Sequence, residues 1–199
     1  MASVLRYVSH PEVLIDPAVP VPEWELSEVG RSRVQTLAAQ AWVADLGRVV
    51  SSSEPKAIET AEILAAAARR SGRVDLDVEV RASTVEIDRS STGYLSHDEH
   101  EAQADRLFGA PHESTQGWER AVDAQARMIA ALADLLEPGA VSDGDGIAVV
   151  GHGGVGTLWW CHLAGESIAR RHDQPRGGCL YSVDLNHGRP NGPWVAFED

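Results

Sequence analysis

The sequence has few cysteines and lacks a long apolar segment. Only two of its 199 residues are cysteine, Cys161 and Cys179, and they lack the paired spacing of a zinc site or a disulfide framework. We interpret both as small core residues and expect a reducing compartment, the cytoplasm. No apolar run approaches the length of a membrane span, and no basic segment followed by an apolar stretch opens the chain. We therefore expect no membrane association.

Positive charge is also scarce. The chain carries 17 Lys and Arg against 30 Asp and Glu, a formal net charge of -13. Because a phosphate backbone is bound by clustered cations, and no such cluster occurs, the composition argues against nucleic acid as a partner. An anionic ligand would have to be held in a local positive pocket. A length of 199 residues fits one domain with a single core, so we predict one domain over residues 1–199.

Short apolar runs alternate with helical periodicities along the chain. This pattern predicts an α/β fold, a single three-layer α/β/α domain with a mostly parallel central sheet. A Pro-rich loop follows the first strand, and Ser27 has the character of a helix N-cap. Strands are expected at 3–8, 47–53, 74–80, 147–152, 177–186 and 193–199, and helices at 28–46, 55–70, 97–108, 118–136 and 153–165.

Residue types suited to catalysis follow three of the predicted strands. His10 ends the first strand in "VSHPEV", Ser51 to Ser53 precede the second helix, and His152 ends "IAVVGH". Ligands of open α/β sheets bind at the carboxyl ends of the strands, where loops meet helix N-termini. Two histidines at one sheet edge indicate a reactive site more strongly than either alone.

The order of these motifs resembles the histidine phosphatase superfamily, the phosphoglycerate-mutase-like fold. That family has an Arg-His-Gly motif after its first strand, then "LTxxGRxQA", "SSxxxRAxxTA", an acidic residue near mid-chain, and a strand ending in "SHGG". The corresponding segments here are "VSHPEV", "LSEVGRSRV", "SSSEPKAIETAEIL", "TVEIDRSSTG" and "VVGHGGV". The resemblance extends over essentially the whole chain, and the segment 86–114 is expected to be an inserted lid.

The resemblance assigns roles to three residues. His10 is implied to be the nucleophile that becomes a phosphohistidine, His152 the second histidine at the phosphoryl group, and Glu86 the proton donor. Asp88 and Glu113 are alternative proton donors.

The positive charge that phosphoryl transfer requires is reduced in this chain. The motif arginine of the family is replaced by Ser9, and the second pocket arginine by Lys56. Arg89 is a candidate compensating cation, and Arg6, on the same side of the first strand as His10 by alternation, is a weaker one. Lys56, Arg89, Ser9 and the backbone N–H at Gly153 form the expected phosphate-binding set.

The sequence therefore predicts a phosphomonoesterase that acts on a small phosphorylated metabolite through a phosphohistidine. The alternative is a phospho-ligand-binding pseudophosphatase that has lost the charge needed for turnover. We expect no cofactor and no metal, because His10 and His152 lack a third ligand at a recognisable spacing. The partners expected are the substrate or inorganic phosphate, and a homodimer is a further candidate, with Trp159 and Trp160 divided between core and interface.

Overall fold

A computed structural model describes residues 3–198. Its main elements follow in chain order: β1 (Val4–Ser9), α1 (Glu28–Ala38), β2 (Leu46–Ser52), α2 (Pro55–Arg70), β3 (Val78–Arg81), α3 (His97–Gly109), α4 (Ala121–Leu132), β4 (Gly146–Gly151), α5 (Gly153–Ala164), β5 (Cys179–Asp184), β6 (Arg189–Pro190) and β7 (Val195–Ala196). Short 3-10 turns η1 (Val21–Glu23), η2 (Ala41–Asp45), η3 (Ala82–Thr84), η4 (Ala133–Leu136) and η5 (Arg170–His172) lie between them.

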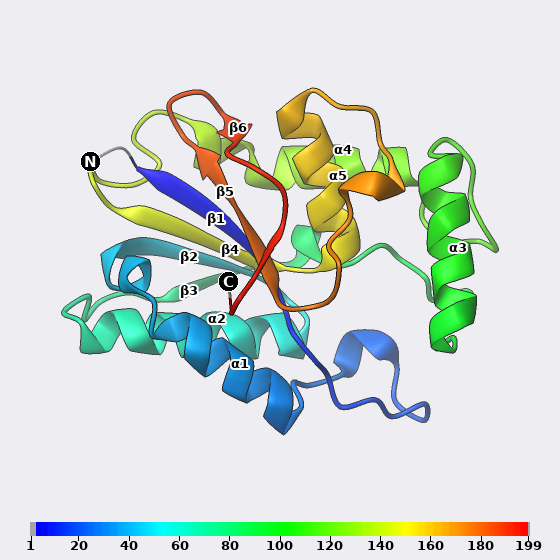
Figure 1. The fold of residues 1–199 in the computed structure, drawn as a ribbon, viewed down its shortest axis with the longest axis horizontal. Coiled ribbons are helices and arrows are strands. Elements are labelled where there is room, and N and C mark those ends of the chain that lie inside the picture. Colours follow the sequence, from blue (N-terminus) through cyan, green and yellow to red (C-terminus); the bar gives the residue numbers. More distant parts are fainter. Residues whose placement is uncertain (1–2, 199) are drawn as a thin grey trace.

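The strands form one sheet in the order β3-β2-β4-β1-β5-β6, with β7 also paired to β5 (Figure 1). Strands β1 to β4 are mutually parallel, whereas β5 runs antiparallel to β1 and pairs antiparallel with β6 and β7. The expected mostly parallel sheet is confirmed. The exposed pattern of β3 fits its place at the sheet edge.

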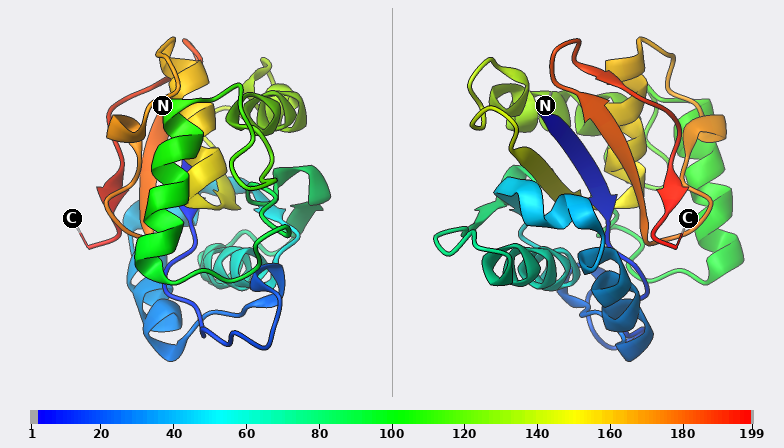
Figure 2. Two further views of the ribbon diagram at one scale, coloured as in Figure 1. Left: turned by 90° about the vertical axis from the view of Figure 1, so that its right-hand side faces the viewer. Right: turned by 60° about the vertical axis from the view of Figure 1, so that its left-hand side comes forward.

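Helices cover both faces of the sheet, which confirms the three-layer prediction. Helices α1 and α2 pack on one face, and α4 and α5 on the other (Figures 1 and 2). Central strand β4 is buried throughout because it is covered on both sides. Helix α3 stands beside η5 at the end of the second layer (Figure 1).

Two local predictions differ from the structure. The first helix is capped by Ser27, whose Oγ accepts from the N–H of Gly30 at 3.1 Å, but it ends at Ala38. It ends there because Gln40 is extended and its amide donates to the Phe197 carbonyl. At the other end of the chain, the expected turn between the last two strands contains β6, because Arg189 and Pro190 pair with Asp184 and Val183.

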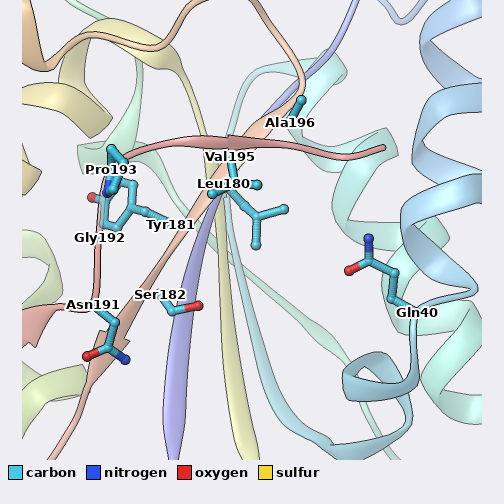
Figure 3. A pocket seen from close by; sticks show the side chains of 9 residues that line it. All are labelled: Gln40, Leu180, Tyr181, Ser182, Asn191, Gly192, Pro193, Val195 and Ala196. Atoms are coloured by element: carbon cyan, nitrogen blue, oxygen red, sulfur yellow. The ribbon is translucent and has the colours of Figure 1, made fainter. Parts of the chain in front are cut away.

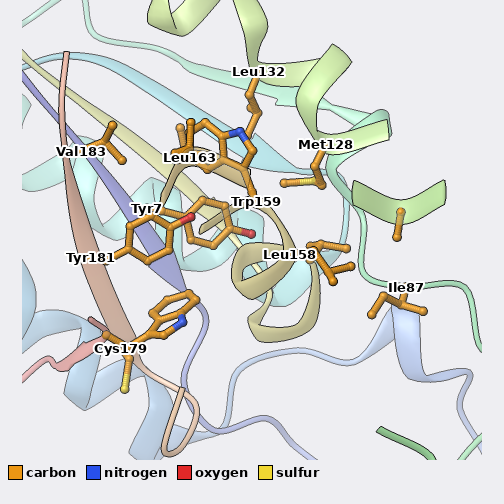
Figure 4. Packing of buried hydrophobic residues seen from close by; sticks show 14 of the residues in the cluster. Tyr7, Ile87, Met128, Leu132, Leu158, Trp159, Leu163, Cys179, Tyr181 and Val183 are labelled. Carbon is orange, nitrogen blue, oxygen red and sulfur yellow. The ribbon is translucent and has the colours of Figure 1, made fainter. Parts of the chain in front are cut away.

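Aromatic side chains fill the layer between the sheet and α5 (Figure 4). The ring of Tyr7 stacks on that of Tyr181 at 5.3 Å and meets Trp194 edge-on at 5.8 Å. Trp159 is in this core, and Trp160 is half-buried, with its indole N–H donating to the Gly192 carbonyl. Among the described residues, no helix combines the length and the apolar character needed to cross a lipid bilayer.

Candidate active site

The two histidines predicted at strand ends lie side by side. Strands β1 and β4 are parallel neighbours, with Ser9 opposite Gly151 in the register. Each histidine therefore leaves the sheet at the same edge. Their rings meet edge-on, with centroids 5.2 Å apart and an interplanar angle of 73°.

The hydrogen bonds of His10 determine which ring nitrogen is available. Its backbone N–H donates to the Gly151 carbonyl at 3.0 Å, and its carbonyl accepts from Gly178 at 3.1 Å, so the backbone is held on two sides. The ring Nδ1 lies 2.8 Å from the Pro11 carbonyl oxygen. Because a carbonyl only accepts, Nδ1 carries the proton and Nε2 keeps its lone pair. Burial, followed by the neighbouring His152 and Lys56, lowers the pKa of His10 to about 3, so the ring is neutral near pH 7.

His152 is fully buried and fixed from two directions. Its backbone N–H donates to the Tyr7 hydroxyl at 3.2 Å, and that hydroxyl donates to the His152 carbonyl at 3.1 Å. Its Nε2 lies 2.8 Å from Ser52 Oγ and 3.4 Å from Glu54 Oε1. Its Nδ1 is buried without a protein partner in the described part of the chain. Burial holds the pKa of His152 well below its usual value, so this ring is also neutral.

Glu86 lies at the N-terminus of α5. Its carboxylate accepts from the backbone N–H of Gly154 at 3.1 Å, of Val155 at 3.0 Å and of Ile87 at 2.9 Å. Burial nevertheless raises the pKa of Glu86 above its ordinary value, as expected of a proton donor.

The two alternative acids lie in other surroundings. Asp88 is exposed and accepts from the N–H of Ser90, which lowers its pKa. Glu113 is exposed beyond the end of α3. The geometry therefore favours Glu86 of the three candidates.

Gly154 makes the approach of Glu86 possible. A Cβ atom on Gly154 would lie 2.8 Å from Glu86 Oε1 and 2.9 Å from Ile87 Cδ1. We expect Gly154→Ala to displace the carboxylate and to destabilise the fold by about 1–3 kcal/mol. Thermal unfolding and phosphatase assays check this. Gly109→Ala is the control, since a Cβ there meets nothing within 4 Å, and a Gly154→Ala variant with wild-type stability and activity would contradict the argument.

Lys56 reaches the site as one half of a buried ion pair. Its ammonium donates to Glu54 and, at 2.9 Å, to the Val21 carbonyl in the loop after β1. Glu54 also accepts from the backbone N–H of Glu86 at 3.0 Å. Two of the three ammonium protons are thus used within the protein, which leaves one for an anion.

Arg89 has fewer partners within the protein than Lys56. Among residues 3–198, no side-chain hydrogen bond or ion pair joins its half-buried guanidinium to another group. The positive charge of Arg89 contributes to lowering the pKa values of His152 and His100, because it opposes protonation of the two rings. It also stabilises the ionised form of Glu86. Arg89 therefore lies within electrostatic reach of the second histidine and the acid.

Arg6 does not reach the site. It stacks over the Trp42 ring at 4.6 Å, near Asp45. Both lie in η2, just before β2 begins, at the opposite end of the parallel strands. Alternation along β1 concerns the side of the strand, and it carries no information on distance along the strand.

Ser9 and Gly153 flank the histidines. Ser9 is fully buried, and its hydroxyl contacts Gln174 and the backbone of Cys179, so it is not open to an anion. At the start of α5, the N–H groups of Gly154 and Val155 are occupied by Glu86. Of the first three amides in this helix, that of Gly153 is the one left without a hydrogen bond within residues 3–198.

Sequence reasoning missed three residues of the site: Tyr7, Glu54 and Gln174. Ser52 belongs to the run Ser51 to Ser53 that the sequence marked at a strand end, and Glu54 falls inside the same recognised segment, "SSSEPKAIETA", so its position was a usable signal. Tyr7 was interpreted only as part of a strand. Gln174 lies in the loop before β5, where no pattern marked it.

The segment 86–114 divides between the site and the periphery. Glu86 and Arg89 belong to the site, and α3 packs against η5, where Arg170 pairs with Glu101. A cavity of about 310 Å³ lies elsewhere, along β5 and the C-terminal segment, and its lining includes Gln40, Leu180 and Val195 (Figure 3). It contains none of the predicted site residues.

Comparison with known proteins places the chain in a family. The family model described as histidine phosphatase superfamily (branch 1) matches residues 19–194, so the chain belongs to that superfamily. The match begins after His10, beyond the altered first motif. No curated protein gives a significant match.

Solved structures have a fold similar to that of this chain over 98–100% of its length. A mycobacterial glucosyl-3-phosphoglycerate phosphatase with inorganic phosphate is 20% identical, with a TM-score of 0.78 and 100% of both chains covered. YhfR from Bacillus stearothermophilus is 21% identical, with a TM-score of 0.75 and 100% of both chains covered. A phosphoserine phosphatase from Entamoeba histolytica with 3-phosphoglyceric acid is 17% identical, with a TM-score of 0.73 and 98% of both chains covered. At these identities the likeness establishes the fold.

Proposed function

We propose that this protein is a phosphomonoesterase that transfers the phosphoryl group of a small phosphorylated metabolite to His10. The observation that carries the proposal is the hydrogen bond from His10 Nδ1 to the Pro11 carbonyl. It fixes the neutral tautomer with a free lone pair on Nε2, which is what a nucleophile requires.

The chemistry proceeds in two balanced steps. First, Nε2 of His10 forms a bond to phosphorus, the bond from phosphorus to the ester oxygen breaks, and Glu86 donates its proton to that oxygen. Then water attacks the phosphohistidine, its proton passes to the Glu86 carboxylate, and inorganic phosphate leaves with the His10 lone pair restored.

Three other groups stabilise the phosphoryl oxygens in this proposal. Ser52 accepts from the backbone N–H of Glu54 at 3.4 Å and can donate its own proton to His152 Nε2. His152 Nδ1, which has no protein partner, is then the protonated nitrogen and donates to the substrate. Arg89 and the remaining proton of Lys56 supply positive charge.

The substrate class rests on the family and on its neighbours. Superfamily neighbours have been solved with inorganic phosphate and with VO3, which supports a small phosphate-bearing ligand here. The first experiment is hydrolysis of p-nitrophenyl phosphate by the purified protein between pH 3 and 9. Because His10 is neutral above a pKa of about 3 and an alkoxide leaving group must take its proton from Glu86, we expect hydrolysis of an alkyl phosphate in the same pH series to be highest in acid and to fall as pH rises through the raised pKa of Glu86.

Glu86→Gln tests the proton donor through its dependence on the leaving group. We expect hydrolysis of an alkyl phosphate such as glycerol phosphate to fall by about 100-fold or more, because an alkoxide leaves poorly without a proton. Hydrolysis of p-nitrophenyl phosphate should fall much less, since p-nitrophenolate is a stable leaving group. The comparison variants Asp88→Asn and Glu113→Gln should keep both rates, and a leaving-group effect in either of them would move the assignment away from Glu86.

The phospho-ligand-binding alternative is favoured by a different observation. Glu54 neutralises Lys56, and Ser9 stands where the family has an arginine, so the pocket is poor in free positive charge. Calorimetric binding of inorganic phosphate without turnover of any phosphomonoester over the same pH range would support this function.

We propose the cytoplasm as the location. Cys161 and Cys179 are both free and buried, which suits a reducing compartment. A homodimer remains a proposal, and sedimentation measures it directly.

A further inference from the structure

The side chain of Gln174 lies between the residues that flank the two histidines. The Ser9 hydroxyl, on the residue before His10, donates to Gln174 Oε1. On the other side, Gln174 Nε2 lies so close to Gly153, the residue after His152, that a Cβ atom on Gly153 would be 2.0 Å from it. The amide thus lies between the end of β1 and the start of α5.

The amide nitrogen has donors to spare. Within residues 3–198, no hydrogen bond engages Gln174 Nε2, although the oxygen of the same amide is used by Ser9. With the amide oxygen accepting from Ser9, the two N–H donors lie beside Gly153, at the helix N-terminus next to His152.

The loop that carries Gln174 is held firmly. The carboxylate of Asp173 accepts from the Thr157 hydroxyl at 2.9 Å, from the backbone N–H of Gln174 at 2.8 Å and from Arg170 at 2.7 Å. Arg170 also pairs with Glu101 of α3. Because these contacts fix the backbone, the Gln174 amide is positioned before any ligand arrives, and little ordering entropy is lost on binding.

The side chain of residue 9 is directed at the side chain of Gln174. Ser9 is fully buried, and its short side chain ends at Gln174 and Cys179. A longer side chain at position 9 would have to enter the volume of the glutamine. A small residue at position 9 and a glutamine at position 174 therefore form one packing unit.

We propose that Gln174 binds a phosphoryl oxygen through Nε2–H and supplies, from the opposite end of the chain, a donor in place of the guanidinium missing at position 9. This inference rests on the proposed function, and it adds a neutral donor to the charged groups Arg89 and Lys56.

The test compares Gln174→Leu with Gln125→Leu. Gln125 is also half-buried, and its amide donates to the Leu158 carbonyl in α5, so its loss perturbs the fold without touching the site. We expect Gln174→Leu to weaken calorimetric binding of inorganic phosphate about tenfold or more, as for a lost hydrogen bond to a charged group. The KM for p-nitrophenyl phosphate should rise in parallel, and Gln125→Leu should leave both unchanged.

A double variant keeps the test decisive if Gln174→Leu folds poorly. Ser9→Arg alone should be destabilised, because Gln174 fills the space, whereas Ser9→Arg with Gln174→Ala should bind phosphate more tightly than Gln174→Ala alone. Unchanged phosphate affinity in Gln174→Leu, with binding intact in the wild type, would overturn the inference while leaving the proposed function standing. A wild-type protein that neither binds nor hydrolyses phosphate would overturn both.

Discussion

Replacing His10 with alanine is expected to reduce hydrolysis of p-nitrophenyl phosphate by at least about 1,000-fold, the order of loss seen when a catalytic nucleophile is removed. The variant lacks the atom that forms the bond to phosphorus. In the other neutral imidazole of the site, His152, the Nε2 lone pair accepts from Ser52 in the proposed arrangement and is not available for attack. Tyr7 and Glu86, the groups nearest in role, are respectively a hydrogen-bonded phenol and an acid held by three amides.

Two measurements test this prediction: the rate of p-nitrophenyl phosphate hydrolysis and the detection of a phosphorylated protein intermediate. Rapid quenching with 32P-labelled substrate should give a phosphoprotein that is stable in base and labile in acid, and His10→Ala should give none. His97→Ala, at an exposed position on α3, is the control and should behave as wild type. Full activity in His10→Ala would exclude His10 as the nucleophile.

The second large effect is expected from Arg89→Ala. The guanidinium is the site cation without an ion-pair partner among the described residues, whereas Lys56 is neutralised by Glu54. Removing such a group from a transition state that carries phosphoryl charge costs about 100-fold in kcat/KM. We also expect weaker binding of inorganic phosphate, and an intermediate loss in Arg89→Lys, since an ammonium cannot make the bidentate contact.

Arg120→Ala is the matched control for this variant. Arg120 is exposed and pairs with Asp123 on the same helical face, outside the site, so its removal should leave kcat/KM within about twofold. If Arg89→Ala kept wild-type phosphate affinity while Lys56→Ala lost it, the phosphate charge would be assigned to Lys56 instead.

The net charge of the site affects both binding and hydrolysis of a phosphorylated ligand. The site contains two acids, the buried Glu54 and the half-buried Glu86, against Lys56 and Arg89. Burial raises the pKa of Glu86, and protonation of this acid leaves the pocket with a net positive charge. Phosphate binding and catalysis should therefore both be favoured by acid, which a titration of phosphate affinity against pH would measure.

Much of the fold could be predicted from local patterns. The N-cap at Ser27, the Pro at the start of α2 and the buried run before His152 each act over a few residues, and each was found in the structure. The early end of α1 could not be predicted, because it depends on Gln40 reaching the carbonyl of Phe197, a residue far along the chain.

The sequence alone determined the order of strands and helices and the presence of a histidine after β1 and β4, because strand and helix periodicity are local properties. Only the tertiary structure decided how those residues are employed: Lys56 is paired with Glu54, Arg6 lies at the wrong end of its strand, and Glu86 occupies amides of α5. The bond between Ser9 and Gln174 joins residues 165 positions apart. Such contacts depend on how the layers pack and which buried polar groups find partners, and one-dimensional spacing does not encode either.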